Sequence, residues 1–236
     1  MSSWAAADLL AERLAWIRER MGRAAQTAGR DPGAIRLLAV TKGHPAGAIE
    51  AAVALGLCDI GESRVQEATV KRAAVAAPGV TWHMVGHLQR NKARAAAALF
   101  DTVHSLDSAA LATALARHRD PGAGLLRVFI EVELTGLPGR TGVEPAQAGA
   151  LLDAVRDLAA LEAVGLMTIA PPGAPDAAGR YFSRLRDLRD ALRESHGVAL
   201  DELSMGMSAD FEVAIAQGAT IIRLGRALFG GTPLAG

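Results

Sequence analysis

Eight short apolar runs, separated by helix-forming segments, are the feature that most constrains the fold of this chain. The runs cover residues 35–40, 57–61, 80–86, 102–106, 125–134, 161–169, 202–207 and 220–225. Apolar runs of this length between turn signals and helical stretches are typical of buried parallel strands. The chain has 236 residues, close to the size of one (β/α)8 barrel. We therefore predict an α/β protein built as a single eight-stranded TIM barrel.

A doubly wound open sheet is the alternative for the same alternation. No G-x-G-x-x-G motif follows the first run, and the chain stops soon after the eighth run, where a barrel closes. No shift in composition and no linker divides the chain. These features favour the barrel, and we predict one domain over residues 1–236.

Residues 1–28 are expected to form an additional helix before the first strand. Charged residues such as Asp8, Glu12 and Arg18 interrupt its apolar residues, which indicates an amphipathic helix and not a signal peptide. Elsewhere no apolar run reaches the roughly 18 residues that a membrane span requires. The single cysteine, Cys58, cannot form an internal disulfide, which is typical of a reducing compartment. We expect a cytoplasmic protein.

The charges of the chain balance, with 25 Lys and Arg against 25 Asp and Glu. A net charge of zero creates no overall field that would attract nucleic acid or an anionic membrane. We therefore expect neither as a partner, and we expect the protein to be a monomer.

Lys42 is the basic residue best placed for chemistry. It follows the first predicted strand, at the end of the barrel where active sites form. A desolvated lysine amine can form a Schiff base, whereas an arginine stays protonated. The alternative is a lysine at the barrel rim that pairs with a carboxylate such as Glu62. Lys71 and Lys92 lie in predicted helices, where we expect solvent-exposed charges.

The loops after the seventh and eighth strands are suited to a phosphate group. Residues 204–208 (SMGMS) end the seventh strand, and Ser208 is placed to cap a helix over about 209–217. Gly225 and Arg226 follow the eighth strand. Glycine lets an anion approach the backbone closely, and the free amides of a first helical turn point toward it. An ordinary helix cap and an ordinary turn would give the same patterns.

Arg223 interrupts the last apolar strand. Alternation through residues 220–224 puts this permanent cation inside an otherwise apolar strand, where burial without a partner is very costly. Either a carboxylate pairs with it or its donors meet a ligand. A lysine amine, a phosphate loop and an inward arginine together indicate pyridoxal 5'-phosphate as the cofactor. A class I aldolase also uses a lysine and a phosphate site, but it leaves Arg223 unexplained.

Five segments carry a resemblance to a known family: LLAVTK, GESRVQE, WHMVGHLQRNK, GLMTIAP and SMGMSADFEVAIAQGATIIRLGRALFG. Along essentially the whole chain they resemble the pyridoxal-phosphate homeostasis proteins, the YggS/PROSC family. The resemblance implies a fold-type III barrel like the N-terminal domain of alanine racemase, which binds pyridoxal phosphate in vitamin B6 homeostasis and has no established catalytic reaction. By this resemblance Lys42 forms the Schiff base and Arg223 faces the pyridine nitrogen. Ser208, Gly225 and Arg226 line the phosphate.

The resemblance also implies three further cofactor contacts. Ser63 stands where the family usually has an asparagine beside the cofactor, so this contact is expected to be shorter or filled by water. Arg140 matches a site where relatives often carry lysine or arginine near the ring. His83 matches a Trp-His motif of the family, although a single histidine in a strand is more often a core residue.

We expect a cofactor carrier and not a catalyst. Arginine keeps its proton and leaves the pyridine nitrogen unprotonated, which weakens the ring as an electron sink. The racemase that the chain resembles takes a second base, a tyrosine, from a C-terminal domain, and this chain ends at Gly236 with its one tyrosine, Tyr181, in a predicted outer helix. Delivery of the cofactor would make apo-enzymes the partners.

Two other classes of function stay open. The alternative to a carrier is a pyridoxal-phosphate-dependent racemase or decarboxylase, with at most weak isomerase-type chemistry. An interaction scaffold would explain the helices, but it would leave the convergence of Lys42, Ser208 and Arg223 unexplained.

Overall fold

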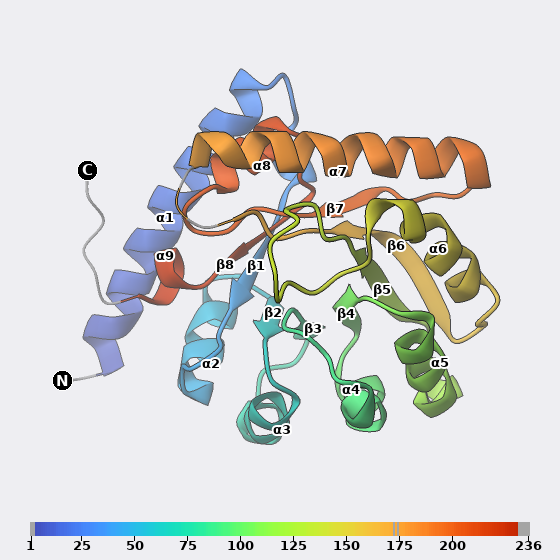
Figure 1. Cartoon of the computed structure of the whole chain (residues 1–236). Coiled ribbons are helices and arrows are strands. Elements are labelled where there is room, and N and C mark those ends of the chain that lie inside the picture. The colour runs from blue at the N-terminus through green and yellow to red at the C-terminus, as the bar shows by residue number, and fades with distance from the viewer. Residues whose placement is uncertain (1–2, 172, 174, 231–236) are drawn as a thin grey trace.

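A closed barrel of parallel strands forms the centre of the protein. The computed structural model describes residues 3–171, 173 and 175–230. Within them eight strands follow one another around the barrel in sequence order, and β1 pairs with β8 to close it (Figure 1). Each predicted apolar run overlaps one strand, so the predicted barrel is confirmed. The strands are β1 (Arg36–Val40), β2 (Asp59–Glu62), β3 (Thr81–Met84), β4 (Thr102–Leu106), β5 (Leu126–Glu131), β6 (Leu161–Met167), β7 (Glu202–Ser204) and β8 (Ile221–Leu224).

Helices surround the barrel and connect its strands. Gly56 follows α2 with a φ of +82°, the left-handed conformation in which a glycine commonly ends a helix. The α-helices are α1 (Ser3–Thr27), α2 (Ala46–Ala54), α3 (Val65–Ala74), α4 (Ala93–Leu99), α5 (Ala109–His118), α6 (Ala148–Arg156), α7 (Pro175–His196), α8 (Phe211–Ala216) and α9 (Arg226–Phe229). Short 3-10 turns occupy η1 (Pro32–Ala34), η2 (Arg90–Lys92), η3 (Pro121–Ala123) and η4 (Pro145–Gln147).

None of the helices in the described part of the chain combines the length and the hydropathy needed to cross a bilayer.

Strand alternation divides the apolar residues into two cores. On β8, Ile222 and Leu224 join the large core between the strands and the helices, whereas Ile221 points into the barrel. The inner core is small and consists of Leu38, Phe129, Val164, Met167 and Ile221. Because these five residues fill only part of the barrel, the rest of its interior is occupied by buried polar side chains, His83, His104, Ser204 and Arg223 among them.

The predicted N-terminal helix packs on the outside of the barrel near its closure. In Figure 1, α1 runs beside α8 and α9. Arg20 of α1 forms an ion pair with Glu212 of α8. Its guanidinium also lies 4.3 Å from the ring centroid of Trp16 and 5.3 Å from that of Phe211. These contacts attach α1 to the helix that follows β7.

Candidate functional site

Lys42 lies at the end of the barrel to which the carboxyl ends of the strands point. It follows Thr41, directly after β1, and its side chain is exposed. Glu62, the carboxylate considered as its alternative partner, is bonded instead to Lys71 at 2.6 Å and to the Thr41 hydroxyl at 2.5 Å. The Lys42 amine is therefore placed at the mouth of the barrel without being engaged by Glu62.

Lys71 is buried, so the prediction of a solvent-exposed charge at this position is wrong. The residue is only 5% exposed. It lies on the same face of α3 as the buried residues Val65 and Ala68, six and three positions earlier. That helical spacing was present in the sequence and could have identified Lys71 as an inward residue. Lys92, the other lysine in question, is half-exposed at the end of η2.

The buried ammonium group of Lys71 holds the backbone on both sides of Lys42. It donates to the carbonyl oxygen of Thr41 at 2.7 Å and to Glu67 Oε1 at 2.7 Å. Glu67 Oε1 in turn accepts from the Gly43 amide at 2.6 Å. Lys42 therefore has a fixed backbone and an exposed side chain.

Arg223 lies inside the barrel, as strand alternation predicted. It is 4% exposed. Its Nη1 donates to the Ser204 carbonyl oxygen at 2.6 Å and to Ser204 Oγ at 2.8 Å, and its Nη2 donates to the Thr168 carbonyl oxygen at 3.0 Å. The described hydrogen bonds thus go to carbonyl and hydroxyl oxygens and not to the carboxylate considered as a partner. Burial lowers the pKa of Arg223 to about 10, against the opposing effect of Glu131 and Asp210, so the group is still protonated at neutral pH.

A chain of polar contacts continues from Arg223 through the barrel interior. Ser204 Oγ lies 2.8 Å from His104 Nδ1, and His104 Nε2 lies 3.0 Å from His83 Nδ1. The chain ends where His83 Nε2 meets Asp59 Oδ1 at 2.9 Å. Both ring nitrogens of His83 thus have partners in the protein, and its link to Arg223 runs through His104 and Ser204. Sequence reasoning missed Asp59, His104 and Ser204, whose only signal was a polar residue within an apolar run.

The loops after β7 and β8 are joined by Ser208. Its hydroxyl accepts from the Ala227 amide in the first turn of α9 at 3.1 Å. The prediction that Ser208 caps the helix after β7 is wrong, because α8 begins only at Phe211. Asp210 occupies the N-cap position without a side-chain hydrogen bond to the helix, and its Oδ1 accepts from the amide of Met207 in the preceding loop at 2.6 Å. Ser208 thereby brings the two loops predicted to form the phosphate site into direct contact.

Gly225 and Arg226 lie at the start of α9. Gly225 precedes the helix, and a Cβ added to it would lie 3.1 Å from the carbonyl oxygen of Val40 on β1. The glycine is therefore also required by the close packing between the ends of β8 and β1. Arg226, the first residue of α9, has an exposed side chain.

Ser63 and Arg140 also follow the carboxyl ends of strands. Ser63 comes after β2, and a Cβ added to Gly86 would lie 2.5 Å from its carbonyl oxygen, so the loops after β2 and β3 are in close contact. The Arg140 Nη2 donates to the carbonyl oxygens of Ile169 at 2.7 Å and Ala170 at 3.2 Å. Arg140 thus joins the loop after β5 to the loop after β6, which leaves only part of its guanidinium for a ligand.

Two buried carboxylate oxygens at this end of the barrel have no hydrogen-bond partner in the described part of the chain. They are Oε2 of Glu62, the last residue of β2, and Oε2 of Glu131, the last residue of β5. Burial raises the pKa of both groups, although Lys71 opposes the shift at Glu62 and the Thr141 hydroxyl opposes it at Glu131. Because a buried polar atom without a partner is costly, these atoms indicate that something outside the chain completes the site.

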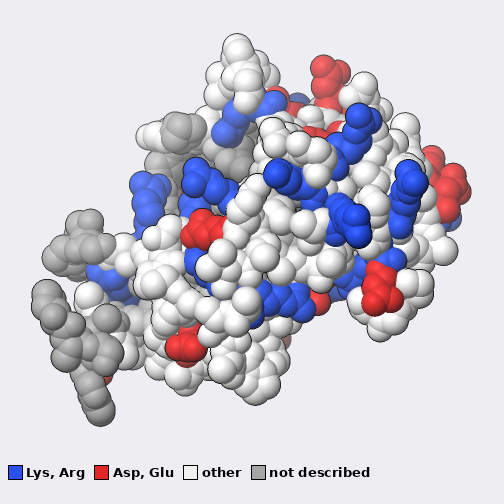
Figure 2. Space-filling model, turned by 90° about the horizontal axis from the view of Figure 1, so that it is seen from below, with Lys and Arg blue, Asp and Glu red and all other residues white. Residues whose placement is uncertain are grey.

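The surface over α3 and α4 is rich in basic side chains. Figure 2 views the molecule from below, where these helices lie in Figure 1, and shows blue side chains across the face with fewer red ones between them. Arg64, Arg72, Arg90 and Arg94 are exposed in this stretch of the chain. The zero net charge of the chain therefore hides a local positive surface, which would attract anions at low ionic strength.

Comparisons with known proteins give one consistent result. The family model described as the N-terminal domain of alanine racemase matches residues 13–233. A pyridoxal phosphate homeostasis protein from Pseudomonas aeruginosa is 44% identical over 222 residues, which cover 94% of this chain and 95% of that protein. A protein of the same name from Escherichia coli is 37% identical over 226 residues, 94% of this chain and 96% of its own.

The solved structures agree with these relatives. PipY of Synechococcus elongatus with pyridoxal phosphate bound has a TM-score of 0.83 and 41% identity, over 94% of this chain and all of PipY (100%). Alanine racemase from Clostridium difficile has a TM-score of 0.70 at 15% identity, over 96% of this chain and 58% of the racemase, and shows the likeness of the fold alone.

Proposed function

Because the chain belongs to the family of pyridoxal phosphate homeostasis proteins, with the alanine racemase N-terminal domain fold, we propose that it binds pyridoxal 5'-phosphate and buffers or delivers it. One observation carries the proposal: β1, β7 and β8 bring Lys42, Ser208 and Arg223 to one end of a single barrel. We place this function in the cytoplasm and propose that the protein acts as a monomer, with apo-enzymes as recipients.

The chemistry of the donors suits each part of this cofactor. Lys42 offers a primary amine to the aldehyde, and Ser208 with the backbone amides of Gly225 and Arg226 offers donors to the phosphate. Arg223 offers the guanidinium that would face the pyridine nitrogen. The unpaired Oε2 atoms of Glu62 and Glu131 are consistent with a polar ligand at this end of the barrel. When bound, the cofactor supplies an aldehyde that condenses with amines and a ring that withdraws electrons.

Ser63, Arg140 and His83, the other predicted cofactor contacts, would each reach the cofactor in a different way. Ser63 lies beside Gly86 at the ends of β2 and β3, where it would contact the cofactor directly. Arg140 would reach the ring with the donors that Ile169 and Ala170 do not use. His83 would act on the cofactor through His104, Ser204 and Arg223, because its own nitrogens are occupied.

Arg223 and Tyr181 support a carrier over a racemase. With a pKa of about 10, Arg223 holds its proton at neutral pH and leaves the pyridine nitrogen unprotonated. Tyr181 is a residue of α7 and packs into the outer core, and its hydroxyl accepts from Arg180 at 2.9 Å. The side chain that could serve as a second base is therefore held within the helical layer.

Reduction of the loaded protein with borohydride, followed by peptide mapping, tests the proposal. Purified protein titrated with pyridoxal phosphate should develop a visible absorption band, and reduction should leave a phosphopyridoxyl group on Lys42. Lys42→Ala should lose the band and keep its circular dichroism spectrum, since an exposed amine contributes little to packing. Lys92→Ala, the matched control, should keep the band. A modified Lys71 or Lys92 with an unmodified Lys42 would contradict the assignment.

A further inference from the structure

The chain of polar contacts from Asp59 to Arg223 links opposite ends of the barrel. Asp59 is the first residue of β2, whereas Arg223 precedes the last residue of β8. The residues between them, His83, His104 and Ser204, belong to β3, β4 and β7. Because the strands are parallel, a contact path from the start of one strand to the end of another crosses the barrel along its axis.

The two ends of this chain, together with neutral imidazoles between them, fix the direction of every hydrogen bond in it. A guanidinium has donors only, so Ser204 Oγ must accept from Arg223. A carboxylate has acceptors only, so His83 Nε2 must carry a hydrogen and donate to Asp59. A neutral His83 can then only accept at Nδ1 from His104 Nε2–H, and a neutral His104 can only accept at Nδ1 from the Ser204 hydroxyl. All four bonds run the same way, from the cation to the anion.

Both imidazoles are neutral in this arrangement and carry their hydrogen on Nε2. Burial, together with the positive charges of His83 when protonated, Arg223, Arg36 and Arg127, holds the pKa of His104 well below its ordinary value. The His104 ring also stacks on Phe129 with 4.4 Å between centroids, which fixes its plane. A doubly protonated His83 would donate from Nδ1 to His104 Nε2 and so move the hydrogen of His104 to its Nδ1. The Ser204 hydroxyl hydrogen would then have no acceptor among these residues, and His104 would lie between two cations.

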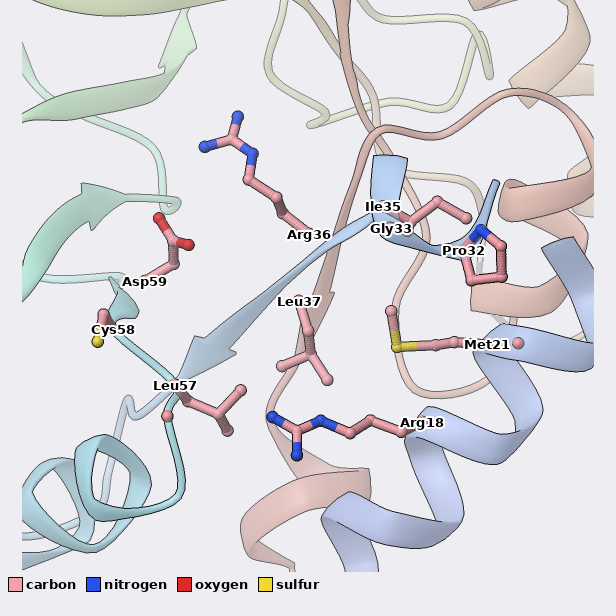
Figure 3. A pocket seen from close by; sticks show the side chains of 12 residues that line it. Arg18, Met21, Pro32, Gly33, Ile35, Arg36, Leu37, Leu57, Cys58 and Asp59 are labelled. Atoms are coloured by element: carbon pink, nitrogen blue, oxygen red, sulfur yellow. The ribbon is translucent and has the colours of Figure 1, made fainter. Parts of the chain in front are cut away.

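Asp59 connects this buried chain to the surface. Its side chain is 28% exposed and lines a cleft of about 450 Å³ together with Arg18, Arg36 and Cys58. In Figure 3, the carboxylate of Asp59 and the guanidinium of Arg36 point toward the same space. Burial favours the neutral acid, but the hydrogen bond from His83 and the nearby Arg36 and Arg127 lower the pKa of Asp59, so it is ionised at neutral pH.

We propose that Asp59, His83, His104 and Ser204 are positioning residues that fix the guanidinium of Arg223 from the opposite end of the barrel. The chain keeps Ser204 Oγ as an acceptor, so Nη1 of Arg223 is committed to Ser204 and the plane of the guanidinium is set. The effect on a bound ligand rests on the proposed pyridoxal phosphate site. A charge at one mouth of the barrel then controls the group that faces the cofactor ring at the other.

The tautomers of the two histidines test the chain without any cofactor. Long-range proton–nitrogen NMR spectra of apo-protein with 15N-labelled histidine should show His83 and His104 neutral, each with its hydrogen on Nε2, at neutral pH. Loss of the corresponding signals in His83→Gln and His104→Gln assigns them. A doubly protonated His83, or a hydrogen on Nδ1 of either ring, would contradict the proposed direction of the hydrogen bonds.

Variants of Asp59, the exposed end of the hydrogen-bond chain, test whether a change there reaches the two buried histidines. Asp59→Ala should free Nε2 of His83 and mix its tautomers, and Asp59→Asn, which still offers an acceptor, should largely preserve them. Glu162→Ala is the matched control, because it removes a carboxylate from the same end of the barrel but on the opposite side, on β6, where Glu162 pairs with Arg127. This control should leave the tautomers of His83 and His104 unchanged. Unchanged tautomers in a folded Asp59→Ala would refute the proposal.

Binding of pyridoxal phosphate supplies the second measurement. Asp59→Ala should weaken binding by roughly three- to tenfold, the effect of one lost hydrogen bond, and should shift the absorption maximum of the bound cofactor. Asp59→Asn should restore most of the affinity and most of the original absorption maximum. Glu162→Ala should match the unchanged protein in both measurements. Equal affinity and spectrum in Asp59→Ala would show that the chain does not position Arg223. Failure of the unchanged protein to bind would refute the proposed function, while the NMR result would still decide the direction of the chain.

Discussion

The ammonium group of Lys71 lies 2.6 Å from Glu62 Oε1, and the two side chains are 6% and 0% exposed. Removing one member of such a pair leaves the other charge buried, which typically costs about 3 to 5 kcal/mol. We expect Lys71→Met to lose stability of this order in urea unfolding, and Lys92→Met, at a half-exposed position, to change by no more than about 0.5 kcal/mol. Equal stability of the two variants would mean that Glu62 is neutral in the folded protein.

Acid should destabilise the protein through His104, beginning below about pH 6.5. In the unfolded chain this histidine takes up a proton near its ordinary pKa of about 6.5, but in the folded protein its pKa is much lower. The unfolded state then binds more protons, so stability falls with falling pH, by at most about 1.4 kcal/mol per pH unit, until the lowered pKa is reached.

Urea unfolding between about pH 5 and pH 7.5 measures this slope, in the range where histidines titrate. His104→Gln should be less stable at neutral pH and should show a shallower slope. His118→Gln, a control at an exposed position at the end of α5, should keep the slope of the unchanged protein. An unaltered slope in His104→Gln would show that another group controls the acid response.

Replacing Gly86 and Gly47 with alanine should have opposite effects on the stability of the protein. A Cβ at Gly86 would lie 2.5 Å from the carbonyl oxygen of Ser63, whereas a Cβ at Gly47 in α2 would meet nothing within 4 Å. Gly86→Ala should destabilise the protein by about 1 to 3 kcal/mol and weaken cofactor binding by displacing Ser63. Gly47→Ala should raise stability by roughly 0.5 kcal/mol, because it reduces the freedom of the unfolded chain. Thermal unfolding and cofactor titration measure both effects, and a stabilised Gly86→Ala would contradict the close contact between these loops.

Ser208→Ala should weaken the binding of pyridoxal phosphate by roughly tenfold, the loss of one charge-assisted hydrogen bond. Its affinity for pyridoxal, which lacks the phosphate, should be low and unchanged. Ser195→Ala on the exposed side of α7 is the control and should affect neither ligand. A similar loss of affinity for both ligands would assign Ser208 to the fold of the two loops and not to the phosphate.

The loaded protein should transfer its cofactor without racemising amino acids. Chiral chromatography of alanine and other L-amino acids should detect no turnover approaching the ordinary enzyme range, about 1 per second or faster. An apo-enzyme mixed with the loaded protein should regain activity. Turnover at enzyme rates would favour the racemase, and failure of transfer would leave storage as the function.

Local patterns predicted the barrel and Arg223, because each depends on the spacing of residues within one element. Eight apolar runs show eight strands, and alternation along 220–224 places Arg223 inside. Lys71 was predicted to be exposed because lysines in helices usually are, although its spacing from Val65 and Ala68 indicated the buried face of α3. The ion pair with Glu62 outweighed the general preference of lysine for solvent.

The interior chain could not be predicted from the same patterns. Asp59, His83, His104 and Ser204 each appear as a polar residue in a different, mainly apolar run. Their contacts depend on how β2, β3, β4 and β7 are staggered around the barrel, which no single run reveals. The helix-capping role of Ser208 was mispredicted for a similar reason, because its partner, Ala227, belongs to α9, after β8, and not to α8, the next helix in sequence.

The pairing of β1 with β8 has a consequence for the order of events during synthesis. A ribosome releases β1, the strand before Lys42, well before β8, the strand that carries Arg223, so the sheet closes only after β8 has emerged. Until then a nascent chain carries the Lys42 amine without the group that would face the cofactor ring or the loops that would hold its phosphate. Selective capture of an aldehyde is thereby deferred to the finished protein, and an incomplete chain offers only an ordinary lysine.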